Sequence, residues 1–190
     1  MTGRRRPGKR LFDVLVAALG LLVLAPVLLA VALGVRLRLG PPVLFRHRRP
    51  GLNEVPFDLL KFRTMTDDRD NDGALRPDAE RLTTWGRTLR ALSLDELPQL
   101  YNVLLGQMSI VGPRPLPMHL LERYDAFQRR RHDVLPGMTG WAQVNGRKAI
   151  SWQRKCELDV WYVDHQSFRL DLKILFLTLS TIARQEGEPS

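Results

Sequence analysis

The sequence contains a single cysteine, Cys156, and no cluster of closely spaced histidines. One thiol excludes an intrachain disulfide framework and a multi-thiolate zinc site. The four histidines lack the spacing of metal ligands, and neither a Walker loop nor a GxGxxG motif is present. Aromatic residues make up 7% of the chain, which leaves few rings for stacking on nucleic-acid bases.

Acidic residues are nearly missing from the first 49 positions, where Asp13 faces ten lysines and arginines. This segment therefore holds the whole formal charge of +9, because the chain from Pro50 onward has 19 basic and 19 acidic residues. A charge confined to one segment favours an anionic membrane surface. A membrane-tethered nucleic-acid binder would instead need a basic patch in the remaining, neutral part of the chain.

An uncharged, mostly apolar run from Val14 to Val35 separates the two basic clusters. A helix of this length spans a hydrocarbon core of about 30 Å. Both flanks are basic, however, and Pro26 lies near the middle, where it breaks helical hydrogen bonding. Each arm, Leu11–Ala25 and Pro26–Arg38, is then only about 20 Å long, too short to cross alone. A re-entrant helix whose two ends lie on one side of the membrane satisfies both observations.

Three other interpretations of the apolar run stay open on these residues alone. One is a straight single-pass anchor with a proline kink, and another is a buried core helix. Ala30-Val31-Ala32 resembles a signal-peptide cleavage site. The apolar run continues past it through Val35, and the lone cysteine gives no sign of an oxidising compartment.

The pattern of the whole chain predicts an α-rich α+β protein. We expect a basic N-terminus and re-entrant helix over residues 1–40, broken at Pro26, and one small, mainly helical domain over residues 41–190. The domain should contain short strands at residues 43–45 and Pro56–Phe62, followed by a mobile loop at Asp67–Pro77. Helical periodicity occurs at Glu80–Leu92, Glu96–Leu105, Met118–Val134, Trp152–Asp164 and Leu170–Ala183.

Several of these helices are expected to lie along the membrane surface. The candidate lipid contacts are Trp85, Leu89, Leu116, Met118, Leu120 and Leu121. Ordinary core packing is the alternative for each of them.

The strongest chemical signal is the acid pair Asp95-Glu96 at the start of an apolar, helix-like stretch. Ser93 and Glu96 have the spacing of a capping box, which is the structural alternative. If the pair is functional, a helix N-terminus would keep Asp95 ionised and attract phosphate. Asp95 could then attack phosphorus, and Glu96 could hold Mg²⁺.

Anionic substrates also require positive counter-charges. The candidates are Lys61 and Arg63, Arg90, Arg147, and Arg114, which stands between two prolines that would orient its guanidinium. The turn-rich segment Leu135–Arg147 could line a diphosphate with its amides, or could be plain turn structure. Arg129–Arg131 is interpreted as a solvated or lipid-facing run.

These motifs resemble the bacterial sugar transferases, the small monotopic phosphoglycosyl transferases that begin lipid-linked glycan assembly. The resemblance covers nearly the whole chain in order: Lys9-Arg10-Leu-Phe-Asp13, Lys61-Phe-Arg-Thr-Met65, Leu92–Gln99, Met108–Pro115, Leu135–Arg147, and Asp159-Val-Trp-Tyr162 through Asp171-Leu-Lys-Ile174. Family members often have serine before the membrane-breaking proline, whereas this chain has Ala25. The break must therefore be supported without that hydroxyl.

The resemblance implies a ping-pong transfer in which Asp95 attacks the sugar-proximal phosphorus of a UDP-sugar and releases UMP. Polyprenyl (undecaprenyl) phosphate would then accept the sugar-phosphate. It also implies that Glu96 binds Mg²⁺. Four cations match family positions that contact phosphate, the carboxylates or the nucleotide: Lys61, Arg90, Arg114 and Arg147.

The resemblance further implies a monotopic enzyme in contact with the lipids of the bacterial cytoplasmic (inner) membrane, with its active site facing the cytosol. No nucleic acid is expected as a partner. The sequence names neither the sugar nor the glycan pathway, and a homodimer is possible. The alternative is a non-catalytic scaffold of the same fold, against which the intact acid pair and its matching cations argue.

Overall fold

The computed structural model describes the backbone of residues 7–146 and 150–185, and side chains as far as residue 180. Its helices are α1 (Pro7–Val23), α2 (Ala25–Leu39), α3 (Asp78–Arg81), α4 (Thr84–Ala91), α5 (Gln99–Leu104), α6 (Ala126–Arg129), α7 (Trp141–Val144), α8 (Trp152–His165) and α9 (Phe168–Gln185). Its strands are β1 (Leu44–Pro50), β2 (Pro56–Phe62), β3 (Ser109–Val111) and β4 (Gly137–Thr139). Four 3₁₀ turns complete it: η1 (Leu52–Glu54), η2 (Leu94–Glu96), η3 (Met118–Arg123) and η4 (Arg130–His132). The predicted helix-rich fold with a short β element is confirmed.

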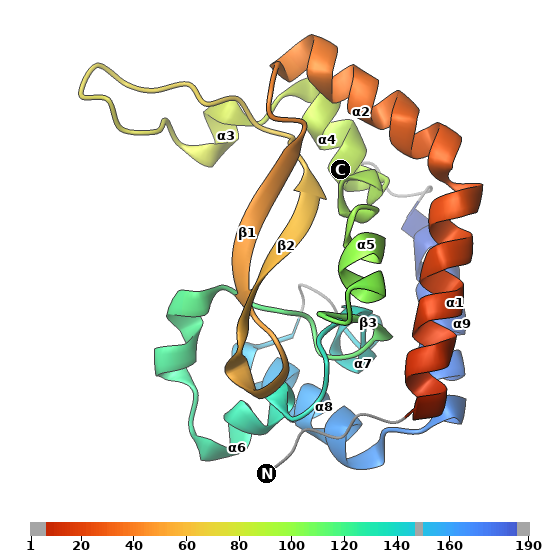
Figure 1. Cartoon of the computed structure of the whole chain (residues 1–190). Coiled ribbons are helices and arrows are strands. Elements are labelled where there is room, and N and C mark those ends of the chain that lie inside the picture. The colour runs from red at the N-terminus through yellow and green to blue at the C-terminus, as the bar shows by residue number, and fades with distance from the viewer. Residues whose placement is uncertain (1–6, 147–149, 186–190) are drawn as a thin grey trace.

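The apolar N-terminal segment forms two helices, α1 and α2, which bend by 64° relative to each other. The break falls at Leu24, two residues before the expected Pro26. Proline fits the first turn of α2 because backbone N–H groups there have no helical acceptor. Among the described residues no single helix is long and apolar enough to cross a membrane, whereas the bent pair together is. In Figure 1, α1 runs along one side of the molecule and α2 continues across its top.

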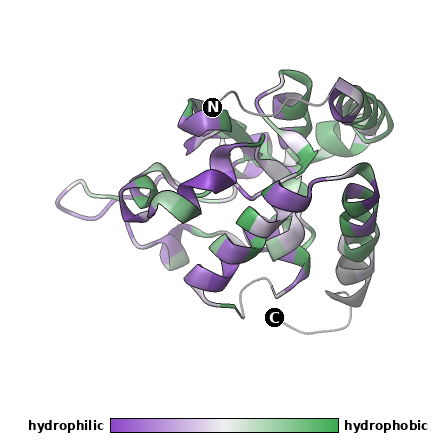
Figure 2. Ribbon diagram, turned by 90° about the horizontal axis from the view of Figure 1, so that it is seen from below, coloured by the Kyte–Doolittle hydropathy of each residue, from purple (hydrophilic) through white to green (hydrophobic). Residues whose placement is uncertain are grey.

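The inner side of the bent pair packs against the rest of the protein. A Cβ atom at Gly20 would lie 3.3 Å from the Leu100 side chain, and one at Gly34 would lie 2.9 Å from the Trp85 ring. The outer side exposes a series of aliphatic residues, each 38–75% accessible: Leu11, Leu15, Leu19, Leu22, Val23, Val27, Leu29, Leu33 and Leu37. Figure 2 shows hydrophobic colour concentrated on the helices at the right of the view, which include α1.

Polar side chains near the start of α1 attach it to three other elements. Lys9 Nζ donates to Asp171 Oδ2 of α9 at 2.7 Å. The Arg10 guanidinium donates to the carbonyls of the last α5 residues. Asp13, 1% exposed, accepts hydrogen bonds from the Ser109 hydroxyl and the Ile110 amide. Lys9 and Arg10, which the sequence assigns to a basic membrane flank, are therefore already bound within the protein.

The two small sheets differ in how well the sequence predicts them. The two strands predicted before and after residue 50 are confirmed, although β1 begins at Leu44 and extends to Pro50. They form an antiparallel hairpin with Phe45 opposite Lys61. The parallel pair β3–β4 joins residues nearly 30 positions apart and is not predicted. Strands of three residues are too short to produce a recognisable alternating pattern. The loop after β2 extends away from the body in Figure 1.

The long C-terminal helices match their predictions, but two other predicted helices are broken. The expected helix at Glu80–Leu92 divides into α3 and α4, because Thr83 accepts the Gly86 amide and caps a new helix. The expected helix at Met118–Val134 is wrong. It becomes η3, α6 and η4, with Asp125 and Gln128 forming a capping box in its middle.

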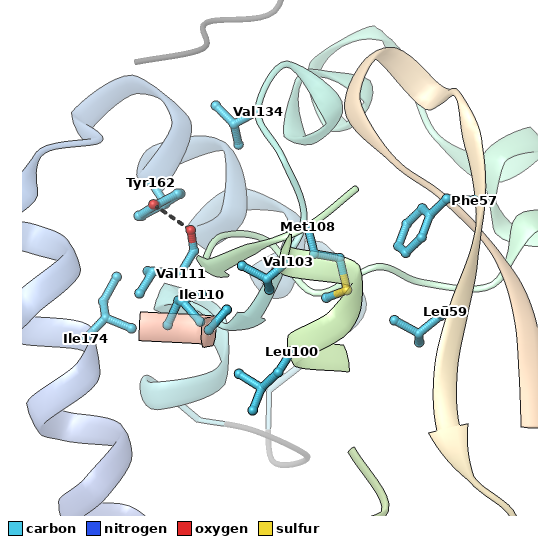
Figure 3. Packing of buried hydrophobic residues seen from close by; sticks show 11 residues of the cluster. Phe57, Leu59, Leu100, Val103, Met108, Ile110, Val111, Val134, Tyr162 and Ile174 are labelled. Carbon is cyan, nitrogen blue, oxygen red and sulfur yellow. Dashed lines mark hydrogen bonds between the residues drawn. The ribbon is translucent and has the colours of Figure 1, made fainter. Parts of the chain in front are cut away.

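The central core lies where the hairpin, α5, β3, α8 and α9 converge (Figure 3). Its one buried phenol, Tyr162, donates to the Val111 carbonyl at 3.1 Å. A second cluster joins α2, β2 and α4 around Leu89, which is fully buried. Leu89 is therefore a core residue, and its expected role as a lipid contact is wrong.

We predict that Asp171→Ala destabilises the protein by about 3 kcal/mol, because it leaves the Lys9 ammonium without its buried partner. It also removes the nearer of the two acceptors of the Tyr162 hydroxyl and leaves only the Val111 carbonyl. The matched control is Asp164→Ala, since Asp164 pairs with Arg130 and both side chains are 43% exposed. It should cost less than about 1 kcal/mol. Denaturant unfolding in detergent, followed by tryptophan fluorescence, measures both. Equal losses would contradict the proposed anchoring role.

Candidate active site

The acid pair lies in the 3₁₀ turn η2, between α4 and α5. Ser93 before it adopts a left-handed conformation, with φ 55°, and its side chain makes no capping hydrogen bond. The capping-box interpretation is therefore wrong. The helix expected from Glu96 begins only at Gln99 and has six residues, so Asp95 does not sit at a long helix N-terminus.

Glu96 is held by two cations from distant parts of the chain. Lys61 Nζ donates to Oε1 at 2.6 Å, and the Arg114 guanidinium donates to both carboxylate oxygens. Burial alone would raise the pKa of Glu96, but Arg114 and Lys61 together lower this pKa to about 2. Glu96 is therefore ionised throughout the physiological pH range.

Asp95 has the opposite environment. Its residue is 7% exposed, and its nearest cationic atom is Lys61 Nζ at 4.0 Å. Within the described part of the chain, no other side chain forms a hydrogen bond with its carboxylate. Burial raises the pKa of Asp95; Lys61 and Arg90 act against this, and Glu96 adds to it. The expectation that a helix end lowers this pKa is wrong. The carboxylate is desolvated, and its own backbone amide is its hydrogen-bond partner.

Buried hydrogen bonds position the two cations. Asn102 of α5 accepts the Leu60 amide and donates to the Asp58 carbonyl, so it fixes β2 and the adjoining Lys61. Arg131 donates to the Arg114 carbonyl at 2.9 Å and pairs with buried Asp159. Since Arg131 is 2% exposed, the interpretation of Arg129–Arg131 as a solvated run is wrong for its last residue.

The remaining predicted cations have different positions. Arg90 donates to the Thr64 hydroxyl at 3.0 Å, and its charge acts on Asp95. Arg63 binds the carbonyls of Met65 and Pro41, so its guanidinium supports a loop outside the acid pair. Arg147 lies outside the described residues.

The segment Leu135–Arg147 offers less free backbone than predicted. Gly137 belongs to β4, and its amide donates to the Pro113 carbonyl at 2.9 Å. This amide therefore supports the segment that holds Arg114, and it is not available to a diphosphate.

The structure brings two further residues to the site, Arg49 and Gln99. With Lys61 and Arg114 they line a cavity of about 150 Å³ that opens to solvent. In the sequence, Arg49 is recognisable only as part of the basic flank of the apolar run. The feature that identifies Arg49 as a site residue is the register of the hairpin, which puts Arg49 on the same face as Lys61.

The acid pair offers only two carboxylates to a metal ion. No group of three His, Cys, Asp or Glu side chains that could hold a metal occurs among residues 7–146 and 150–180. Mg²⁺ typically uses one or two carboxylates and completes its shell with substrate phosphates and water. The pair fits such a site, although both Glu96 oxygens are bound by cations that a metal ion would partly replace.

Comparison with known proteins settles the family. The model of the family described as bacterial sugar transferase matches residues 4–185. The chain belongs to this family. Bacillus subtilis contains a relative called uncharacterized sugar transferase EpsL, which is 59% identical over 94% of this chain and 89% of the relative.

Two other relatives have more specific names. UDP-glucose:undecaprenyl-phosphate glucose-1-phosphate transferase of Klebsiella pneumoniae is 41% identical over 90% of this chain but only 39% of its own length. The exopolysaccharide production protein ExoY of Sinorhizobium fredii is 39% identical over 98% of this chain and 92% of its own length. The sugar transferase chain thus matches both a similarly sized relative and part of a longer one.

We predict a specific pH dependence of stability from Glu96. Its pKa is about 2 in the folded protein and 4.5 as an ordinary glutamate, so its ionised form stabilises the fold fully above pH 4.5. This contribution is lost as the pH falls from 4.5 toward 2. The difference in unfolding free energy between the unmodified protein and Glu96→Gln should therefore be constant above pH 4.5 and shrink below it. Glu157→Gln, at an exposed ion pair, is the control, and a pH-independent difference for Glu96→Gln would refute the assignment.

Proposed function

We propose that this protein transfers a sugar-1-phosphate from a UDP-sugar to polyprenyl (undecaprenyl) phosphate and releases UMP. Asp95 attacks the sugar-bearing phosphorus, the bond to the nucleotide phosphate breaks, and a covalent aspartyl sugar-phosphate forms. An oxygen of the acceptor phosphate then attacks the same phosphorus and regenerates the Asp95 carboxylate. The names of the Klebsiella and ExoY relatives support this activity and a role in exopolysaccharide assembly.

The observation that carries the proposal is that cationic side chains form hydrogen bonds with one of the two adjacent acids and not with the other. Lys61 and Arg114 hold Glu96, whereas Asp95 has no side-chain hydrogen bond in the described part of the chain. A buried carboxylate without side-chain hydrogen-bond donors is a stronger nucleophile than a hydrated one. The same cations would bind substrate phosphate oxygens, which accept charge-assisted hydrogen bonds.

We also propose that Glu96, together with the substrate phosphates, holds Mg²⁺. When bound, the ion neutralises negative charge on the phosphate oxygens. The residues of the chain perform the remaining tasks. Asp95 supplies the nucleophile, and Lys61 and Arg114 orient the phosphates.

For the membrane arrangement we propose that α1 and α2 form a re-entrant helix in the bacterial cytoplasmic membrane, with the active site facing the cytosol. The exposed aliphatic side of the bent pair suits contact with lipid tails. Arg36 and Arg38, in the last turn of α2, suit the anionic head-group region. A monotopic arrangement lets UDP-sugar enter from water and the carrier phosphate from the bilayer.

We expect Asp95→Asn to abolish the covalent intermediate, because an amide is not a nucleophile toward phosphorus. Purified protein is incubated with UDP-sugars carrying a label in the sugar-linked phosphate, and acid-stable protein label and UMP release are measured. Asp164→Asn, at an exposed surface pair, is the control and should label like the unmodified protein. Equal labelling of Asp95→Asn would exclude Asp95 as the nucleophile.

The same assay tests the metal. Chelation by EDTA should abolish labelling, and added Mg²⁺ should restore it. Full labelling in EDTA would contradict the metal proposal while leaving the nucleophile assignment intact.

We predict that tags before α1 and after α2 are both accessible from the cytosolic side of the membrane. A re-entrant helix keeps its ends on one face, because each arm is too short to cross alone. Cysteine labelling in intact cells and inverted vesicles measures the accessibility of each tag. A tag after α2 that reacts from the outside would establish a single-pass anchor.

A further inference from the structure

One face of the β1–β2 hairpin directs Arg49 toward the acid pair. The register pairs Arg49 with Phe57, His47 with Leu59, and Phe45 with Lys61. Directly paired residues of an antiparallel ladder project to the same side. Phe57 and Leu59 are 6% and 3% exposed, so this side is the inner one. Arg48 projects to the outer side, where its exposed side chain pairs with Asp58.

The inner face leads into the cavity of about 150 Å³ described above. Arg49, Lys61, Gln99 and Arg114 supply its polar lining. Neither acid of the pair contributes to the lining, but Lys61 and Arg114, which do, are the two residues bound to Glu96. The cavity therefore adjoins the Glu96 side of the pair. Three cations around a single carboxylate leave it with net positive charge.

Two residues that line this cavity each have a buried donor atom with no partner within the described residues. Gln99 is 2% exposed, and its Nε2 atom makes no hydrogen bond. The Arg49 Nε atom is likewise buried and unpaired, although the guanidinium contacts His47 Nδ1 at 3.1 Å. Burial and the nearby charge of Arg114 lower the pKa of Arg49. Unpaired buried donors beside several cations are costly for the free protein. A small rotation of the Arg49 and Gln99 side chains toward a phosphate oxygen in the cavity would satisfy them.

If the proposed function holds, the reaction consists of two substitutions at the same phosphorus atom, and both require a site that binds a phosphate group beside it. In the first, Asp95 forms a P–O bond while the bond to the UMP phosphate breaks and its electrons leave with UMP. In the second, the acceptor phosphate forms a P–O bond while the bond to Asp95 breaks. Attacking and leaving oxygens lie roughly in line at phosphorus. Both phosphates must therefore occupy the side of the phosphorus opposite Asp95.

We propose that Arg49, together with Gln99, binds the phosphate group that leaves as UMP in the first step and the carrier phosphate that enters in the second. The site recognises a phosphate monoester and is used twice in one catalytic cycle. This inference rests on the proposed function. It extends that function to Arg49, which no family motif above includes, and gives a role to Gln99, the last residue of the motif Leu92–Gln99.

Arg49→Gln tests the inference, and Arg48→Gln is the matched control, because Arg48 lies next to it on the outer face. Circular dichroism and thermal unfolding first establish that both variants are folded. Arg49→Gln should weaken UMP binding, measured by equilibrium titration, by about tenfold or more, the value of one charge-assisted hydrogen bond. Arg49→Lys should recover part of the loss, and Arg48→Gln should match the unmodified protein.

A second arm separates the two sources of phosphate. Preformed aspartyl adduct, freed of nucleotide, is exposed to increasing polyprenyl phosphate, and the half-saturating concentration for transfer is measured. Arg49→Gln should raise it by about as much as it weakens UMP binding. Loss of UMP binding alone would overturn the shared site, and unchanged UMP binding would overturn the whole inference. An unmodified protein that forms no adduct refutes the proposed function, whereas the UMP titration still tests the cavity.

Discussion

The sharing of the Glu96 carboxylate between Lys61 and Arg114 is the interaction on which the site depends. Burial would otherwise raise the pKa of this carboxylate, whose side chain is 20% exposed, and two cations this close would otherwise repel each other. The three groups come from the end of β2, the turn η2 and the segment after β3. Each therefore stabilises the position of the other two. The neighbouring Asp95 lies near the positive charge of Lys61, 4.0 Å away, but forms no hydrogen bond with it.

This arrangement needs backbone support, because long cationic side chains hold one geometry only when their stems are fixed. The Asn102 side chain connects α5 to β2 through two hydrogen bonds with the β2 backbone. Arg131, neutralised by Asp159 of α8, holds the carbonyl of Arg114. The buried ion pair Arg131–Asp159 thus acts on the site through the backbone of Arg114, without contacting either acid of the pair.

The sequence predicts those parts of the site that local pattern encodes. The pair Asp95-Glu96, the hairpin and the proline-flanked Arg114 are recognisable because neighbouring residues determine them. The errors are non-local. Ser93 has capping-box spacing, but the reversal between α4 and α5 forces it into a left-handed conformation. Arg131 looks like part of a solvated basic run until Asp159, 28 positions later, folds against it. Arg49 could be separated from Arg48 only by knowing the register of β1 with β2.

The bent helix pair and the acid pair are connected through α4 and α5, the two helices on either side of the acid pair. The turn η2 lies between α4 and α5. Trp85 of α4 contacts α2 at Gly34, and Leu100 of α5 contacts α1 at Gly20. Each helix beside the acid pair thus rests on one arm of the bent pair, at a glycine that permits close approach. In the proposed membrane arrangement, the depth of α1 and α2 in the lipid therefore sets the height of Asp95.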